Sequence, residues 1–178
     1  YPIRKVFKNK REFHFRNTSA LSIDTEKNIL HTADGDVQYD YLIIATGSTS
    51  NYFGNKNIEN LSMPMKTVPE ALNLRSLFLQ NFEASLLTSD LRERERLMNY
   101  VIVGGGPTGV ELAGAMAELK NHVLPNDYPD LDIRRMKISL IEAGDSLLSA
   151  MNTKARTTAE EYLKKLGVEL YLSTFVKD

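Results

Sequence analysis

The last third of the chain alternates short apolar runs with stretches of helical spacing. Three apolar runs predict strands, at residues 100–103, 137–142 and 168–172. Two stretches with helical spacing lie between them, at residues 110–124 and 153–166. Gly167 follows the second helix as a C-terminal cap. Strand–helix–strand–helix–strand is the order of a parallel, doubly wound sheet, so the pattern predicts an α/β fold of the Rossmann type.

The first 47 residues predict β structure instead. Residues 12–24 mix apolar and polar positions, and residues 29–41 contain a turn signal at Asp34-Gly35, which is typical of a small antiparallel meander. The run from Tyr41 to Gly47 is continuously apolar and ends in glycine. Such a run predicts a strand buried on both faces, as in a parallel sheet.

The middle of the chain predicts a loop followed by helices. Residues 48–65 are rich in Asn, Ser, Gly and Pro and predict a loop. Residues 68–87 have a helical period, with Pro69 in the first turn. The charged segment 91–96 alternates in sign, so we interpret it as a solvated helical connector rather than a nucleic-acid patch.

Composition removes several classes of function. With 22 Lys and Arg against 23 Asp and Glu, the chain has a net charge of −1, which argues against an electrostatic grip on DNA, RNA or acidic lipid. Its lack of cysteine excludes a disulfide framework, an iron–sulfur cluster and a redox disulfide within these residues. No apolar run approaches the roughly 18–20 residues of a membrane span. The three histidines have no metal-site spacing, so we expect no metal.

A glycine-rich turn carries the strongest chemical signal. It matches G-x-G-x-x-G between a predicted strand and a predicted helix, and comprises Gly104, Gly105, Gly106, Pro107, Thr108 and Gly109. Gly104 allows the tight turn, Gly106 allows a pyrophosphate to approach the backbone, and Gly109 allows the helix to lie close to the sheet. A phosphate loop of the Walker type would need Lys and Ser or Thr after Gly109, and Val110 and Glu111 stand there.

Two acidic residues accompany this turn. Glu142 ends the second predicted strand, where a dinucleotide site needs an acceptor for the adenosine ribose. It follows Gly104 by 38 residues, and residues 120–135 account for the excess over the usual spacing of about 20. A carboxylate there repels a 2′-phosphate and favours NAD(H) over NADP(H); the alternative is a solvated acid. Glu111 lies early in the helix, where a functional role and compensation of the helix dipole are equally open.

Three segments together resemble the type II NADH dehydrogenases. They are the run from Tyr39 to Ser48, the segment Asn51-Tyr-Phe-Gly54, and the run from Val101 to Ala113 that contains the glycine turn. Proteins of that family contain two dinucleotide domains and pass electrons from NADH through FAD to a quinone. The resemblance implies that residues 1–65 belong to an FAD domain, including the meander and the Ala-Thr-Gly strand. It assigns residues 66–98 to a helical connector and residues 99–178 to an NAD domain.

The resemblance also implies roles for individual residues. Ala45, Thr46 and Gly47 would contact FAD, the glycine turn would bind the NADH pyrophosphate, and Glu142 with the adjacent Ala143 would lie at the adenosine ribose. The acid that matches Glu111 lies near the nicotinamide in that family, which favours its functional reading. The parent protein would use a quinone, attach peripherally to the cytoplasmic face of a membrane through regions outside this sequence, and be compatible with a homodimer.

The chain begins at Tyr1 rather than Met, and we expect it to be a soluble fragment of that parent. Because most of the FAD site lies outside it, we expect the fragment to be catalytically inactive. Two alternatives remain at this point. One is a flavoprotein like the ferredoxin or nitrite reductases, with another electron acceptor. The other is a module that binds NADH without catalysis.

Overall fold

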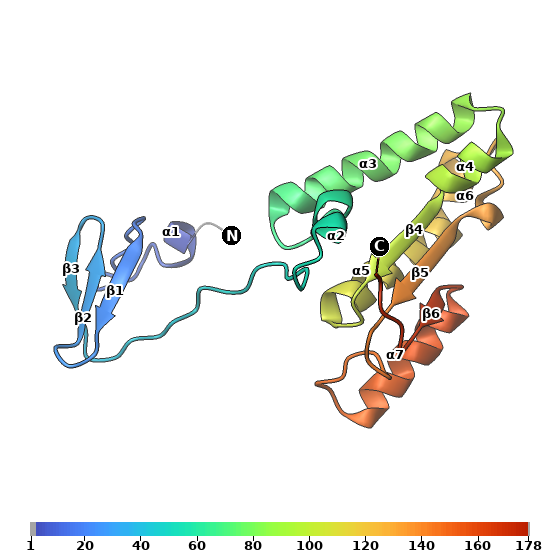
Figure 1. The fold of residues 1–178 in the computed structure, drawn as a ribbon. Helices are drawn as coiled ribbons and strands as arrows, with labels where there is room; N and C mark the ends of the chain where they lie inside the picture. Colours follow the sequence, from blue (N-terminus) through green and yellow to red (C-terminus); the bar gives the residue numbers. More distant parts are fainter. Residues whose placement is uncertain (1–2, 178) are drawn as a thin grey trace. The chain divides into compact units, whose positions relative to one another are not determined.

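The computed structural model describes residues 3–177, and the chain divides into two compact units, Tyr1–Ser48 and Thr49–Asp178. Each unit has a three-stranded sheet of its own, as Figure 1 shows. The sheet of the first unit is antiparallel and that of the second is parallel. The predicted α/β class, with a meander and a Rossmann-like parallel sheet, is therefore confirmed.

The first unit begins with one helical turn, α1 (Ile3–Val6), and continues into the meander. Its strands pair in the order β1-β2-β3 and are β1 (Ala20–Asp24), β2 (Ile29–Thr32) and β3 (Gly35–Gln38). The β2–β3 turn lies at the predicted place: Gly35 has φ +116°, and the Thr32 hydroxyl donates to its carbonyl at 2.6 Å. The Thr32 side chain thus stabilises the turn conformation that Gly35, with its positive φ, permits.

The run from Tyr41 to Gly47 forms no strand, so the prediction of a buried strand ending in Ala45, Thr46 and Gly47 is wrong for this chain. Tyr41, Ile43 and Ile44 are 94%, 87% and 67% exposed. The reason is physical: a strand needs a neighbour to take up its backbone N–H and C=O groups, and neither described sheet pairs with this run. An apolar composition cannot supply that neighbour.

The second unit starts with a segment predicted as loop that contains a short helix, α2 (Lys56–Leu61). Its N-cap is Asn55, whose side chain accepts the N–H of Ile58 at 3.0 Å. A helix of six residues has no periodic apolar stripe to reveal it, so the polar composition of residues 48–65 pointed to a loop.

Helix α3 (Val68–Leu87) has the bounds that the periodicity predicts. A capping box starts it: the Glu70 carboxylate accepts the Thr67 N–H at 2.8 Å, and the Thr67 hydroxyl accepts the Glu70 N–H at 3.4 Å. Phe78 and Phe82 are its buried aromatic residues and anchor it to the core.

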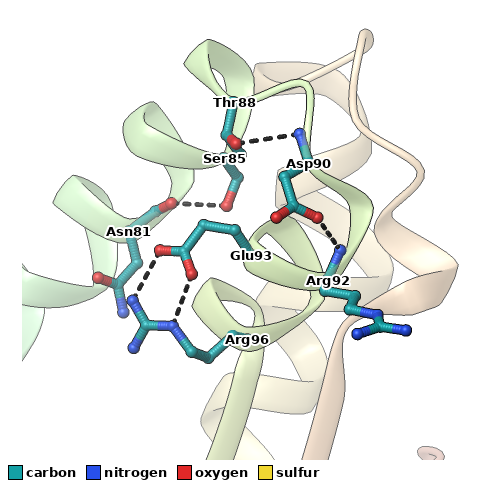
Figure 2. A network of polar contacts seen from close by, with 7 residues as sticks. All are labelled: Asn81, Ser85, Thr88, Asp90, Arg92, Glu93 and Arg96. Atoms are coloured by element: carbon teal, nitrogen blue, oxygen red, sulfur yellow. Dashed lines mark hydrogen bonds and ion pairs between the residues drawn. The ribbon is translucent and has the colours of Figure 1, made fainter.

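A tight corner joins α3 to α4 (Leu91–Leu97), the predicted helical connector (Figure 2). Asp90 caps α4 by accepting the Arg92 N–H at 2.9 Å, and Glu93 pairs with Arg96 at 2.7 Å on the helix surface. Arg94 instead turns back to α3, where it donates to the carbonyls of Ser85 at 3.0 Å and Thr88 at 2.5 Å. One arginine of the charged run therefore satisfies the end of the preceding helix.

The parallel sheet has the order β4-β5-β6 and consists of β4 (Asn99–Val103), β5 (Lys137–Ile141) and β6 (Glu169–Tyr171). The connecting helices are α5 (Pro107–Glu118) and α7 (Thr153–Lys165). Ile102 and Leu140 stand opposite each other in register and are both buried in the core beneath these helices. Gly167 has φ +87° and ends α7 as predicted.

Helix α5 differs from the predicted helix 110–124 at both ends. It starts at Pro107, passes at its C-terminal end into a π-helical turn, Leu119–Val123, and is followed by α6 (Leu124–Asp127). Pro125 therefore does not end the helix but lies in the first turn of α6. Proline lacks an N–H and crowds the carbonyl four residues earlier, which interrupts an α-helix but is tolerated in a first turn.

Within residues 3–177, no helix is both long enough and apolar enough to cross a bilayer.

Candidate functional site

The glycine turn joins β4 to α5, as the sequence predicted. The N–H of Gly104 donates to the Ile141 carbonyl at 2.8 Å and so extends the ladder between β4 and β5. Gly104 has φ +110°, a conformation that residues with a Cβ rarely adopt. The chain can therefore leave the strand abruptly and start a helix within three residues.

The glycines of the turn face different surroundings. A Cβ on Gly109 would lie 1.9 Å from the Gly104 carbonyl oxygen, so only glycine lets α5 lie this close to the strand end. A Cβ on Gly106 would meet nothing within 4 Å. The backbone at Gly106 is thus open to an approaching group, which is what a pyrophosphate needs.

The N-terminus of α5 opens beside Gly106. Gly106 is the N-cap and supplies no side-chain cap, and the first turn has no acidic residue. Pro107 and Thr108 are exposed there. The first N–H groups of a helix have no partner inside the helix, and they carry the positive end of its dipole. This end of α5 is accordingly suited to bind an anion.

Glu142 lies directly against this turn. It follows β5, and its two carboxylate oxygens each accept a backbone N–H: Oε2 from Gly105 at 2.5 Å and Oε1 from Gly144 at 2.6 Å. A carboxylate oxygen has two lone-pair directions, so each oxygen keeps one for a further donor. The structure thus brings the predicted ribose acceptor to the predicted pyrophosphate turn.

The loop after Glu142 braces the turn from the other side, which the sequence reasoning missed. The Leu148 N–H donates to the Gly105 carbonyl at 2.8 Å, and Leu147 is fully buried against Gly105. Both backbone polar groups of Gly105 are therefore bound by residues 142–148. The available signal was the pair of leucines, Leu147-Leu148, which follows the polar residues Asp145 and Ser146 in this loop.

Glu111 is the fifth residue of α5 and is exposed. The dipole effect is confined to the first turn of a helix, so its position gives little support to simple dipole compensation. Ala143 is exposed next to Glu142. Ala45, Thr46 and Gly47 are exposed in the first unit, and on their own they do not enclose a flavin.

Within residues 3–177, no three His, Cys, Asp or Glu side chains gather closely enough to hold a metal ion. His31 contacts Asp36 at 2.7 Å and His122 contacts Glu118 at 3.2 Å, both on the surface.

Residues 4–178 match the family described as pyridine nucleotide-disulphide oxidoreductase. The chain belongs to this family. Membership agrees with the fold, a parallel sheet in the second unit and an antiparallel sheet in the first.

Within the family, the relatives agree with the resemblance seen in the sequence. A type II NADH:quinone oxidoreductase of Mycobacterium tuberculosis is 39% identical over 140 residues, which cover 79% of this chain and 30% of that protein. An external alternative NAD(P)H-ubiquinone oxidoreductase of Arabidopsis thaliana mitochondria is 34% identical over 188 residues, 98% of this chain and 32% of that protein. The chain therefore spans about 30% of the length of these curated relatives.

A solved structure supports the same family assignment. The structure of NDH2 from Plasmodium falciparum in complex with NADH has a TM-score of 0.74 and 26% identity, and the match covers 90% of this chain and 34% of that one. The resemblance to type II NADH dehydrogenases is confirmed by these relatives.

Proposed function

We propose that this chain binds NADH at the glycine turn, with the pyrophosphate at the N-terminus of α5 and the adenosine ribose on Glu142. The observation that carries the proposal is the bond between the Glu142 carboxylate and the Gly105 N–H. That bond fixes an acceptor for ribose hydroxyls next to an uncapped helix N-terminus and the open backbone of Gly106.

The hydrogen bonds that hold the Glu142 carboxylate affect which nucleotide the site prefers. Because two backbone N–H groups hold the carboxylate, it cannot swing away without losing both bonds. Two hydroxyls of a ribose can still donate to its free lone pairs, whereas a 2′-phosphate would bring negative charge against a fixed negative charge. We therefore expect NADH to bind at least about tenfold more tightly than NADPH, a difference of about 1.4 kcal/mol.

We further propose that the chain is part of an FAD-dependent NADH:quinone oxidoreductase. The named relatives and the NDH2 structure that contains NADH support this assignment. When bound, NADH supplies a hydride and FAD carries its electrons onward to a quinone. The contribution of this chain is to bind and orient the nucleotide. The complete protein would act at a membrane, because quinones are apolar. The family resemblance suggests peripheral attachment at the cytoplasmic face and is compatible with a homodimer.

Within that enzyme we assign two further positions. Glu111 is exposed on α5, one turn beyond Thr108, and would lie toward the nicotinamide end of the bound nucleotide. Ala45, Thr46 and Gly47 would contact FAD. These assignments rest on the family resemblance. In the part of the chain that the structure describes, no side-chain hydrogen bond or ion pair fixes the role of Glu111 or of residues 45–47.

Calorimetric titration of the 178-residue chain with NADH and with NADPH tests the nucleotide site. Glu142→Ala should weaken NADH at least tenfold and reduce the preference over NADPH. Glu161→Ala removes an exposed carboxylate from α7 and serves as the matched control. Gly106→Ala should fold, because its Cβ meets open space, yet should bind NADH more weakly because that Cβ occupies the path of the pyrophosphate.

Two results would contradict the proposal. If Glu142→Ala binds NADH as tightly as the unaltered chain, the ribose assignment is wrong. If the folded chain binds neither nucleotide at millimolar concentration, the turn has only a structural role.

A further inference from the structure

The loop between β5 and α7, residues 142–152 and called here the bracing loop, contacts the glycine turn on two sides. Its first part is fixed by backbone. The Glu142 N–H donates to the Tyr171 carbonyl at 2.9 Å, and the Gly144 carbonyl accepts the Ser173 N–H at 2.8 Å. These bonds continue the pairing of β5 and β6 beyond the ends of both strands. The sheet therefore holds the start of the bracing loop.

The middle of the bracing loop, residues 145–147, makes no hydrogen bond from backbone to backbone within the described residues 3–177. It nevertheless touches the turn. A Cβ on Gly105 would lie 2.7 Å from Leu147 Cδ2 and 3.0 Å from Glu142 Oε2, so Leu147 and the carboxylate flank Gly105 together. The next residue, Leu148, has φ +51°, a left-handed conformation that is costly for a residue with a Cβ. Such a conformation persists only where surrounding contacts hold it.

Two side chains of α7 supply contacts to this middle part. The Arg156 guanidinium donates through Nη1 to the Ser146 hydroxyl at 3.3 Å. Oε1 of Glu160 accepts the Leu147 N–H at 3.4 Å. Arg156 and Glu160 are four residues apart, so they lie on one face of the helix, a turn from each other. Helix α7 thus holds the bracing loop through its side chains.

Stability does not account for Arg156. Its Nε atom is buried without a hydrogen-bond partner among residues 3–177, and no carboxylate there forms an ion pair with it. Its other contact is the Thr153 hydroxyl, which accepts from Nη2 at 3.3 Å. A half-buried cation whose partners are two hydroxyls loses hydration without gaining an ion pair. We therefore expect its replacement by an apolar side chain to leave stability almost unchanged.

We propose that Arg156 is a positioning residue of the nucleotide site, a role that rests on the proposed binding of NADH. Through Ser146 it holds Leu147 against Gly105. That contact keeps the Gly105 N–H directed at the Glu142 carboxylate, which is the proposed acceptor for the ribose hydroxyls. A residue that fixes the geometry of a binding group affects affinity without touching the ligand. Arg156 acts in this way on Glu142.

Calorimetric titration of the full chain with NADH tests this role together with urea denaturation. Arg156→Met keeps a long apolar side chain and should weaken NADH about fivefold, the order expected for one lost hydrogen bond. The urea midpoint should stay unchanged, whereas a merely structural role would lower the midpoint and leave the affinity of the folded chain intact. Lys165→Met makes the same charge change at the exposed far end of α7 and should alter neither quantity.

Ser146→Ala separates positioning from an effect of charge. It removes the acceptor of the Arg156 guanidinium without changing any charge, and should weaken NADH by about the same factor. The double variant Arg156→Met with Ser146→Ala should bind NADH as either single variant does, because both remove one contact. Added to Glu142→Ala, Arg156→Met should have no further effect on NADH affinity, because the carboxylate that it positions is gone.

Amide hydrogen exchange distinguishes a failure of this inference from a failure of the NADH proposal, because it needs no nucleotide. Arg156→Met should speed exchange of the Gly105 and Leu148 N–H groups about fivefold and leave the amides of α3 unchanged. Faster exchange in a chain that binds no NADH would overturn the NADH proposal and support the hold of Arg156 on the loop. The inference is overturned if exchange is unchanged, if Glu142→Ala weakens NADH and Arg156→Met does not, or if the effects of Arg156→Met and Ser146→Ala on NADH affinity add.

Discussion

Two runs of this chain look alike in sequence and differ in structure. Residues 41–47 and residues 100–104 are both short apolar runs that begin with tyrosine and end in glycine, and both glycines have positive φ, +75° at Gly47 and +110° at Gly104. The second run is β4, paired along its length with β5. The first is exposed backbone outside both sheets.

The comparison shows that an apolar run forms a strand only where another strand is present to pair with it. The backbone groups of β4 are satisfied by β5, and Ile102 is covered by the core beneath α5 and α7. Residues 41–47 are similarly apolar but have no such partner among the described residues. Apolar side chains favour burial, but a neighbouring strand and a covering helix must be present before burial can occur.

In the region around the paired strand β4, a substitution at Gly109 should lower the free energy of unfolding the most. Gly109→Ala forces a Cβ to within 1.9 Å of the Gly104 carbonyl oxygen, so α5 must move away from the strand end. We expect a loss of about 3 kcal/mol in the free energy of unfolding of the second unit, measured by urea denaturation. Gly114→Ala is the control on the same helix: its Cβ meets only Leu163 at 3.8 Å, and it should stabilise by up to about 1 kcal/mol. Equal effects of the two substitutions would contradict the close approach at Gly109.

A matched pair of isoleucines compares the two runs directly. Ile102 is 8% exposed in β4, and Ile43 is 87% exposed in the unpaired run. Ile102→Ala should cost about 2–4 kcal/mol in the free energy of unfolding, because it leaves a cavity in the core. Ile43→Ala should change it by no more than about 0.5 kcal/mol. A large loss at Ile43 would show that the run is buried in solution after all.

The tyrosines that begin the two runs give the smallest effect, one that depends on pH. Burial raises the pKa of Tyr100 to about 12, so the folded chain favours the neutral phenol. The resulting stability is complete below about pH 10, the pKa of an unfolded tyrosine, and is lost as pH rises toward 12. Tyr100→Phe should flatten this decline in the free energy of unfolding. Part of the decline should remain, because burial first and Glu83 second also raise the pKa of Tyr128.

Tyr41→Phe is the control, because it removes a tyrosine hydroxyl from a side chain that is 94% exposed. If the two substitutions change the alkaline decline equally, burial of Tyr100 is not its cause.

Much of the second unit could be predicted from local pattern. Helix α3 has the predicted bounds, and the three strands and the glycine turn lie where their runs and spacing placed them. The structure differs from the prediction where a helix is too short to show a period, or where one residue is compatible with either the end or the start of a helix. Helix α2 depends on the Asn55 cap rather than on a period, and Pro125 starts a helix where it was expected to end one.

The sequence predicted the residue types of the candidate site but not the hydrogen bonds between those residues. The spacing pattern predicted the glycines and Glu142 as site residues, because each suits a need of the proposed pyrophosphate or ribose. That Glu142 bonds Gly105 and Gly144, and that Leu147 and Leu148 brace the same turn, could not be read from a spacing. The contacts to Gly105 join residues 37 to 43 positions apart, and only the packing of β5 and its loop beside β4 brings them together.

The sequence by itself determined the order of the three strands and the two connecting helices of the second sheet, its parallel class, the glycine turn and the sign of the charge at its acid. These follow from period, backbone freedom and residue chemistry, which act over a few residues. The tertiary structure decided which apolar run became a strand, how the Glu142 carboxylate is held, and that Arg156 of α7 donates to Ser146 in the loop after β5. Each of these depends on which distant groups become neighbours, because burial and hydrogen bonding require a partner as well as a suitable residue.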